Sequence, residues 1–215
     1  MSFLGRKRQN YQLLKLHLTI FEHSALVTLK PYCGFNVILL TAPHFMTTEK
    51  IQMIYLKDDG TFPNSELPVL FYKGALDVPF LFPASYVKKL FEDNGWSNAW
   101  DDGVFEYHHY HSNTHEVIGV YEGETVLQLG GEKGKKLKVE KGDVLIIPAG
   151  VAHKNLNEDD DIQCIGAYPG GMDYDMNYGK ANERPGTDNN IKKVRVPESD
   201  PIFGVLGGLA EIWVK

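Results

Sequence analysis

Residues 107–116 read Tyr-His-His-Tyr-His-Ser-Asn-Thr-His-Glu, and they hold four of the eight histidines in this 215-residue chain. Side chains at positions i and i+2 of a β-strand share a face, so His109 and His111 can direct two imidazoles at one point. Residues 112–114 are turn formers, so a returning strand can bring Glu116 to the same point. This pattern predicts three metal ligands that are close in sequence and in space, while His108 and His115 face away.

A fourth ligand is expected from His153, because Pro148 and Gly150 precede it and give a sharp entry into a strand. Three neutral imidazoles and one carboxylate suit Mn, Fe, Ni, Co, Cu or Zn better than Ca or Mg. An octahedral ion with four protein ligands keeps two positions, where a substrate oxygen and water or dioxygen can bind. The predicted metal ligands are therefore His109, His111, Glu116 and His153.

The chain around these ligands alternates short apolar runs with turn residues, and sixteen of its 21 glycines fall at or after Gly103. Such a pattern is typical of an antiparallel β-sandwich or barrel, so we expect an all-β fold. A short pairing within residues 204–214 is expected to close it. The expected strands are residues 69–72, 104–111, 116–121, 125–129, 136–139, 144–147 and 162–168.

One or two short helices are expected beside the strands. Residues 84–93 carry apolar side chains at helical spacing, with Ser85 as the N-cap and Asn94 and Gly95 as the stop signal. Residues 169–190 are polar, rich in Gly and Tyr, and have neither a helical nor a strand period. They are either a loop that covers the site or a tail on the surface.

The net charge of the chain is −6, from 22 basic and 28 acidic residues. A protein that binds nucleic acid needs a basic surface, so this charge argues against such a partner. The longest apolar piece of the opening stretch, residues 37–40, is far too short to cross a bilayer, and no membrane association is expected. A small-molecule substrate or ligand is the expected partner.

Residues 1–50 differ in character from the rest, since they carry a net charge of +4 and leave −10 for residues 51–215. They do not resemble a signal peptide, because polar residues follow the basic run. We expect an N-terminal extension that is poorly ordered or mispredicted, with a targeting role as the alternative. Two cysteines and no Asn-x-Ser/Thr acceptor favour the cytoplasm.

Two motifs resemble those that define the cupin superfamily. They are separated by 18 residues, a spacing typical of compact microbial-type cupins. The resemblance implies one jelly-roll-like cupin barrel, a double-stranded β-helix, over residues 51–215 with its core at about residues 100–168. Related barrels commonly pair through edge strands, so it also implies a homodimer. The motifs are Gly103-x5-His109-x-His111-x4-Glu116-x6-Gly123 and Gly142-x5-Pro148-x-Gly150-x2-His153-x3-Asn157.

A narrower resemblance, to the YjlB-like cupins of bacteria and fungi, covers about residues 51–205 and leaves residues 1–50 without a counterpart. Cupins with this ligand set include dioxygenases, oxalate decarboxylases and oxidases, isomerases, and proteins that bind without catalysis. The residues that carry the narrower resemblance are Trp100, 108–117, 129–131, 148–150 and 167–169.

This resemblance favours a mononuclear Fe(II) or Mn(II) oxidoreductase, dioxygenase-like, that acts on a small organic molecule; Ni, Zn, Co and Cu stay open as the metal. One alternative is a non-catalytic small-molecule or sugar-binding cupin. Another is a metal-dependent isomerase or decarboxylase, which needs an acid/base carboxylate near the metal. Whether the protein is an enzyme stays open at this point.

Strand alternation also predicts what surrounds the metal. Phe105 and Tyr107 are expected on the face of His109, and Ile118 and Val120 on the face of Glu116, so the expected pocket is mostly apolar.

Two side chains, Tyr107 and Gln128, are the candidates for a hydrogen bond to a metal-bound ligand, with Gln163 and Tyr168 as further possibilities. Carboxylates at positions 173 and 175 can serve as acid or base if the loop that carries them folds over the opening.

Overall fold

The computed structural model describes residues 18–21, 24–27, 51–157 and 161–214. The chain divides into two compact units, Met1–Phe45 and Met46–Lys215. In the first unit, β1 (Leu18–Phe21) and β2 (Ser24–Val27) pair antiparallel. The expectation of an extension over residues 1–50 otherwise concerns residues outside those described.

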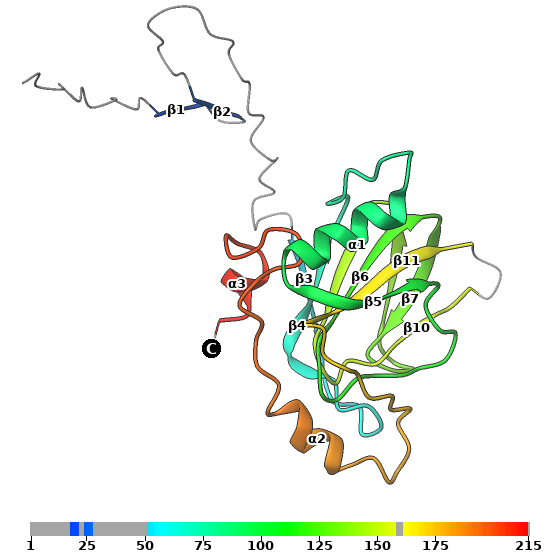
Figure 1. Ribbon diagram of the computed structural model, residues 1–215. Coiled ribbons are helices and arrows are strands. Elements are labelled where there is room, and N and C mark those ends of the chain that lie inside the picture. The colour runs from blue at the N-terminus through cyan, green and yellow to red at the C-terminus, as the bar shows by residue number, and fades with distance from the viewer. Residues whose placement is uncertain (1–17, 22–23, 28–50, 158–160, 215) are drawn as a thin grey trace, which may run out of the picture. The chain divides into compact units, whose positions relative to one another are not determined.

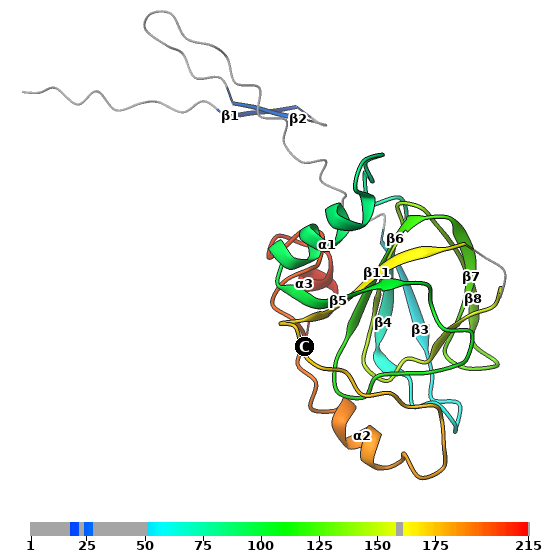
Figure 2. The ribbon, with the colours of Figure 1, turned by 45° about the vertical axis from the view of Figure 1, so that its right-hand side comes forward.

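The second unit contains two antiparallel sheets that face each other (Figures 1 and 2). The larger has the strand order β3-β4-β9-β6-β11-β5 and the smaller the order β10-β7-β8, with no strand shared between them, so the barrel is not closed. The predicted all-β fold is confirmed. The strands are β3 (Ile51–Leu56), β4 (Ser65–Tyr72), β5 (Trp96–Asp102), β6 (Glu116–Glu122), β7 (Glu124–Leu129), β8 (Lys135–Glu140), β9 (Val144–Ile147), β10 (His153–Asn155) and β11 (Gln163–Pro169).

The central strands of the large sheet, β6 and β9, are buried on both faces, and their side chains alternate between two cores. In β6, Val117 packs with one core and Ile118 and Val120 with the other, which also contains Leu127 of the small sheet. Glu116 therefore lies on the same face as Ile118 and Val120, between the sheets, as strand alternation predicts. This register brings a carboxylate next to the apolar core between the sheets.

Helix α1 (Pro83–Asp93) covers the outer face of the large sheet (Figure 1). Its buried residues are Val87 and Phe91, and the absence of a Cβ at Gly119 lets the Phe91 ring approach β6. The expected Ser85 cap is wrong: the helix begins after Phe82, with no side-chain cap, and the proline at its start has no N–H to satisfy.

The expected strand over residues 104–111 is also wrong. Only isolated bridges occur there, from His109 to His153 and from Tyr110 to Asn177. Single bridges on different partners do not enforce alternation, so Phe105 and Tyr107 are about half exposed, at 49% and 47%, while His108 is buried. The two ligand histidines of this segment nevertheless remain close together.

The C-terminal part wraps the large sheet rather than adding a strand. Residues 204–214 contain α3 (Leu209–Ile212) in place of the expected pairing, and the Asp200 carboxylate accepts hydrogen bonds from Leu209 N and Tyr72 Oη. Before them, α2 (Gly186–Ile191) follows the long connection from β11. None of the helices in the described ranges is long and apolar enough for a bilayer crossing.

Candidate metal centre

Three of the predicted ligands converge at one end of the space between the sheets. One nitrogen from each of His109, His111 and His153 lies within 4.8 Å of the others, and all three side chains are buried. His153 is the first residue of β10, and backbone hydrogen bonds in both directions tie it to His109. This pairing holds the two imidazoles 4.1 Å apart between ring centroids.

Backbone carbonyls fix which nitrogen of each imidazole faces the centre. The Nδ1 atoms of His109, His111 and His153 lie 3.2, 2.6 and 3.2 Å from the carbonyl oxygens of Tyr107, Asp175 and Val151. A carbonyl only accepts, so each Nδ1 carries the proton and each Nε2 presents a lone pair. Three lone pairs at one point are the arrangement that a metal ion requires.

Glu116, the fourth predicted ligand, lies beside two of the three imidazoles. Its Oε2 lies 3.4 Å from His111 Nε2 and 3.3 Å from His153 Nε2. This oxygen is buried and has no hydrogen-bond partner among the described residues. Because a buried, unpaired carboxylate oxygen is costly, its position among imidazole lone pairs fits a cation at this point.

The other oxygen of Glu116 is held by two aromatic side chains. Its Oε1 accepts hydrogen bonds from Trp100 Nε1 at 3.1 Å and from Tyr168 Oη at 3.0 Å. The Trp100 indole lies over Gly166 of β11, where a Cβ would overlap the ring. A glycine in one strand thus lets an indole of the neighbouring strand reach the carboxylate.

Burial and the neighbouring charges set the protonation of this cluster in the metal-free protein. Burial, aided by His153, lowers the pKa of His109 to about 3, so this imidazole is neutral at ordinary pH. Burial opposes a charge on His111, but the Glu116 carboxylate outweighs it and raises the pKa of His111. Burial likewise opposes a charge on Glu116, yet His111 and His153 hold its pKa well below its usual range. A proton on His111 and a metal ion would therefore compete for the same place.

The four predicted ligands line one pocket with a volume of about 230 Å³. Its walls are mostly aromatic and aliphatic, as expected. Phe105 lines it despite being half exposed, and Ile118 forms part of its interior. The remaining lining residues are Trp100, Asp102, Gly103, Val104, Tyr168, Tyr174 and Met176.

The segment after β11 lies against this pocket, so the alternative of a site-covering loop is the one the structure shows. Tyr174 and Met176 line the pocket, and the Tyr174 ring stacks on Tyr168 at 4.7 Å. The Asp175 carboxylate accepts hydrogen bonds from Ser112 N at 2.6 Å and Ser112 Oγ at 2.5 Å. These bonds hold the carbonyl of Asp175 against His111, so Asp175 positions a ligand instead of facing the pocket.

Of the four side chains predicted to hydrogen-bond a metal-bound ligand, only Tyr168 lines the pocket. Tyr107 stacks on Phe105 outside the pocket, and Gln128 donates to the carbonyl of Glu132. Gln163 is paired with Tyr121. Tyr168 does reach the site. Trp100 was not predicted as a site residue, and the signal that points to it is the glycine opposite it on β11.

The two remaining histidines of the cluster are buried outside the pocket. His108 packs on Phe62, with its Nε2 3.4 Å from Glu132 Oε1, and burial lowers its pKa. His115 accepts a hydrogen bond from Ala149 N and packs on Trp213. Both face away from the predicted ligands, as expected, but strand alternation would leave His108 exposed, and it is buried because the segment is not a regular strand.

Comparison with known proteins identifies the family. The Cupin domain matches residues 101–165. The chain is 46% identical over 165 residues to YjlB of Bacillus subtilis (strain 168), described as an uncharacterized protein, and the match covers 76% of this chain and 97% of YjlB.

Two solved structures share part of the fold. Acireductone dioxygenase from Bacillus anthracis, with a cadmium ion in its active centre, is 15% identical with a TM-score of 0.36, over 49% of this chain and 80% of that one. Oxalate decarboxylase from Bacillus subtilis is 17% identical with a TM-score of 0.31, over 52% of this chain and 28% of that one. The Cupin domain match, the identity with YjlB and the two facing antiparallel sheets show that this chain belongs to the cupin superfamily.

Proposed function

We propose that this protein is a mononuclear metal-dependent oxidoreductase, dioxygenase-like, that acts on a small organic molecule. The observation that carries the proposal is the convergence of three imidazole lone pairs and one unpaired carboxylate oxygen at the pocket. The mixed nitrogen and oxygen donor set with a single negative charge suits a divalent transition metal, and Fe(II) or Mn(II) is the favoured ion because an oxidoreductase needs a redox-active one.

The four ligand side chains would hold the ion and leave coordination positions toward the pocket. A bound Fe(II) or Mn(II) ion supplies Lewis acidity and one-electron redox chemistry. Trp100 and Tyr168 fix the rotation of the Glu116 carboxylate, and the carbonyls that accept from each Nδ1 fix the imidazole rings. The chain's contribution is thus a rigid ligand set with predetermined proton positions.

Pocket composition favours redox chemistry over acid–base chemistry. Apart from the ligands, the ionisable side chains that line it are Asp102, Tyr168 and Tyr174. Tyr168 already donates to Glu116, and burial together with that carboxylate raises the pKa of its hydroxyl. Asp102 is exposed, and its Oδ1 accepts from Gly103 N. An isomerase or decarboxylase needs a group poised to move a proton, and none of the described lining residues is free and buried for that role.

The substrate is expected to be small and largely apolar. A volume of about 230 Å³ lies below the usual range for drug-sized ligands. Phe105, Tyr174 and Met176 form apolar walls around it. A planar or unsaturated molecule with one or two oxygens for the metal fits these walls.

Oxygen consumption tests the proposal. The apo protein is loaded in turn with Fe(II), Mn(II), Ni(II) or Zn(II) and supplied with thiols, diketones, aromatic diols and small acids, with His153→Ala as the ligand-loss control. Uptake that needs both a substrate and an intact His153 supports a dioxygenase. Gas evolution or isomer formation without uptake would assign the protein to the decarboxylase or isomerase class. Saturable binding without turnover would assign it to the non-catalytic cupins.

A further inference from the structure

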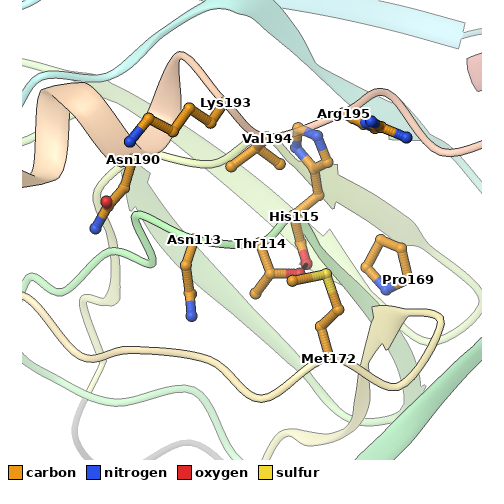
Figure 3. Close-up of a pocket in the computed structure, with 9 residues that line it drawn as sticks. All are labelled: Asn113, Thr114, His115, Pro169, Met172, Asn190, Lys193, Val194 and Arg195. Atoms are coloured by element: carbon orange, nitrogen blue, oxygen red, sulfur yellow. Dashed lines mark hydrogen bonds between the residues drawn. The ribbon is translucent and has the colours of Figure 1, made fainter.

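A second pocket, with a volume of about 410 Å³, shares no lining residue with the metal centre. Figure 3 shows that it is built from three separate parts of the chain: residues 113–115, residues 169–172 at the end of β11 and after it, and residues 190–195 at the end of α2 and after it. Its size falls within the range for small-molecule sites. The lining residues are Asn113, Thr114, His115, Pro169, Met172, Asn190, Lys193, Val194 and Arg195.

Two cations occupy one edge of this pocket, Lys193 and Arg195, with Val194 between them (Figure 3). Both are exposed, and neither forms a salt bridge or side-chain hydrogen bond with any described residue. Arg184, by contrast, is saturated by Asp58 and Asp188. No carboxylate is among the lining residues of the second pocket, so the formal charges that line it are both positive although the chain as a whole is acidic.

The rest of the lining is apolar or already hydrogen-bonded. Pro169, Met172 and Val194 present carbon and sulfur atoms to the cavity (Figure 3). Asn113 donates to the carbonyl of Asp173 and accepts from Asp175 N. Asn190 donates to Ser112 Oγ. The charged lining residues are therefore two exposed cations that no described carboxylate pairs with, and an inorganic ion would leave the apolar part of the cavity uncovered.

We propose that this pocket binds an organic anion, a carboxylate or phosphate monoester with an apolar body. Arg195 is suited to a two-point contact with either oxyanion and would bind the anionic group, while Lys193, which extends to the other side of Val194 (Figure 3), would add a second positive charge to the pocket wall. The apolar body would lie on Met172 and Val194. Anion binding at this pocket does not require that the metal centre has the function proposed above.

An occupant of this pocket would touch the backbone that carries the metal ligands. Residues 113–115 lie between His111 and Glu116, and Pro169 follows Tyr168, which donates to Glu116. Asn190 also connects through Ser112 to Asp175, whose carbonyl accepts from His111. An anion bound in this pocket could therefore act as an effector of the metal centre. Alternatively, the pocket is a second binding site that the same residues join to the predicted ligands.

Calorimetric titration of the metal-loaded full chain tests the proposal. The probes are benzoate and phenyl phosphate as organic anions, and benzamide as the neutral counterpart. We expect at least one anion to bind with one site per chain, and benzamide to bind at least about tenfold more weakly. The stronger of the two anions identifies the oxyanion class that the pocket prefers.

Charge-removing variants locate the binding. In the double variant Lys193→Gln/Arg195→Gln the affinity for the preferred anion should fall at least about tenfold, and Val194→Phe, which fills the cavity, should abolish binding. Lys192→Gln is the matched control, because Lys192 is an exposed neighbour that does not line the pocket. Unchanged affinity in the double variant would place the anion elsewhere, for example on the metal, and would overturn the proposal. Absence of binding by both anions would overturn it as well.

Discussion

Tyr168 donates a hydrogen bond from its hydroxyl to Glu116 Oε1 over 3.0 Å, and this bond sets the direction of the opposite carboxylate oxygen. With Oε1 also bound by Trp100, Oε2 faces His111 and His153 without a hydrogen bond of its own. The orientation of the predicted ligands therefore depends on side chains that are not predicted ligands themselves. This dependence leads to the first predictions.

Removing the hydroxyl in Tyr168→Phe should lower metal affinity about 10- to 100-fold without unfolding the protein, because the carboxylate loses one of its two orienting bonds. Trp100→Phe should act in the same direction. Competition with a chelator measures the affinity, and thermal unfolding checks the fold. Equal affinity in wild type and both variants would show that Glu116 is held by the barrel alone.

A methyl group at position 166 should disturb the same carboxylate from a distance. In Gly166→Ala the new Cβ would overlap the Trp100 indole, so the ring must shift away from Glu116. We expect weaker metal binding and lower thermal stability than in wild type. Gly186→Ala is the control, because nothing lies within 4 Å of a Cβ there. If both variants bind metal alike, the proposed role of the indole is wrong.

Asp175 and Asp173 are a matched pair of carboxylates in residues 169–190, the segment that covers the pocket. Asp175→Ala removes two hydrogen bonds to Ser112 and frees the carbonyl that accepts from His111, so metal affinity should fall about tenfold or more. Asp173→Ala should leave it unchanged, since the Asp173 carboxylate makes only a 3.5 Å contact with Asn98. Metal titration of both variants checks this difference. A larger loss of metal affinity in Asp173→Ala than in Asp175→Ala would contradict this assignment and point to Asp173 as the functional carboxylate.

Arg184, in the segment of residues 169–190 that covers the pocket, pairs with Asp58 in the loop after β3. Its contribution to stability should depend on pH. Hydrogen bonds from Arg184 hold the pKa values of Asp58 and Asp188 below the ordinary 3.8. A carboxyl whose pKa is lower in the folded state stabilises the protein above the unfolded value and loses that contribution as pH falls through the folded value.

The midpoint of thermal unfolding should therefore be lower in Arg184→Gln than in wild type near pH 7, and this difference should shrink below pH 3.8. The exposure of Asp58 limits the effect to less than about 1 kcal/mol. Arg195→Gln serves as the comparison, because Arg195 has no partner among the described residues. A constant difference across this pH range would exclude the ion pairs as its cause.

Much of the fold, and the gathering of the four predicted ligands at one pocket, follow from local sequence signals. The alternation in β6 places Glu116 inside together with Ile118, because one face of that strand packs against the small sheet. The spacing of His109 and His111 predicts their proximity even though the segment between residues 104 and 111 is not a strand. The predicted proximity of the ligands is still correct, because the β-bridge to His153 fixes the position of His109 directly.

Sequence signals did not reveal β5 or the role of Trp100. Strand β5 reads Trp-Ser-Asn-Ala-Trp-Asp-Asp, which lacks apolar alternation, and it lies at the edge of the sheet where β11 is its only neighbour in the strand order. Its identity as a strand comes from pairing with a distant segment. The same long-range pairing brings Gly166 opposite Trp100, a contact that no local pattern encodes.

Metal content of protein purified without a metal-binding tag is the most direct test of the four-ligand site. Elemental analysis should give one equivalent of Fe or Mn per wild-type chain, while His109→Ala and His153→Ala should each lose it. Glu116→Gln should retain more metal than the histidine variants, since an amide oxygen can still coordinate. His108→Gln, a buried neighbour that does not line the pocket, should retain the full equivalent. Full occupancy in both His109→Ala and His153→Ala would contradict the assignment.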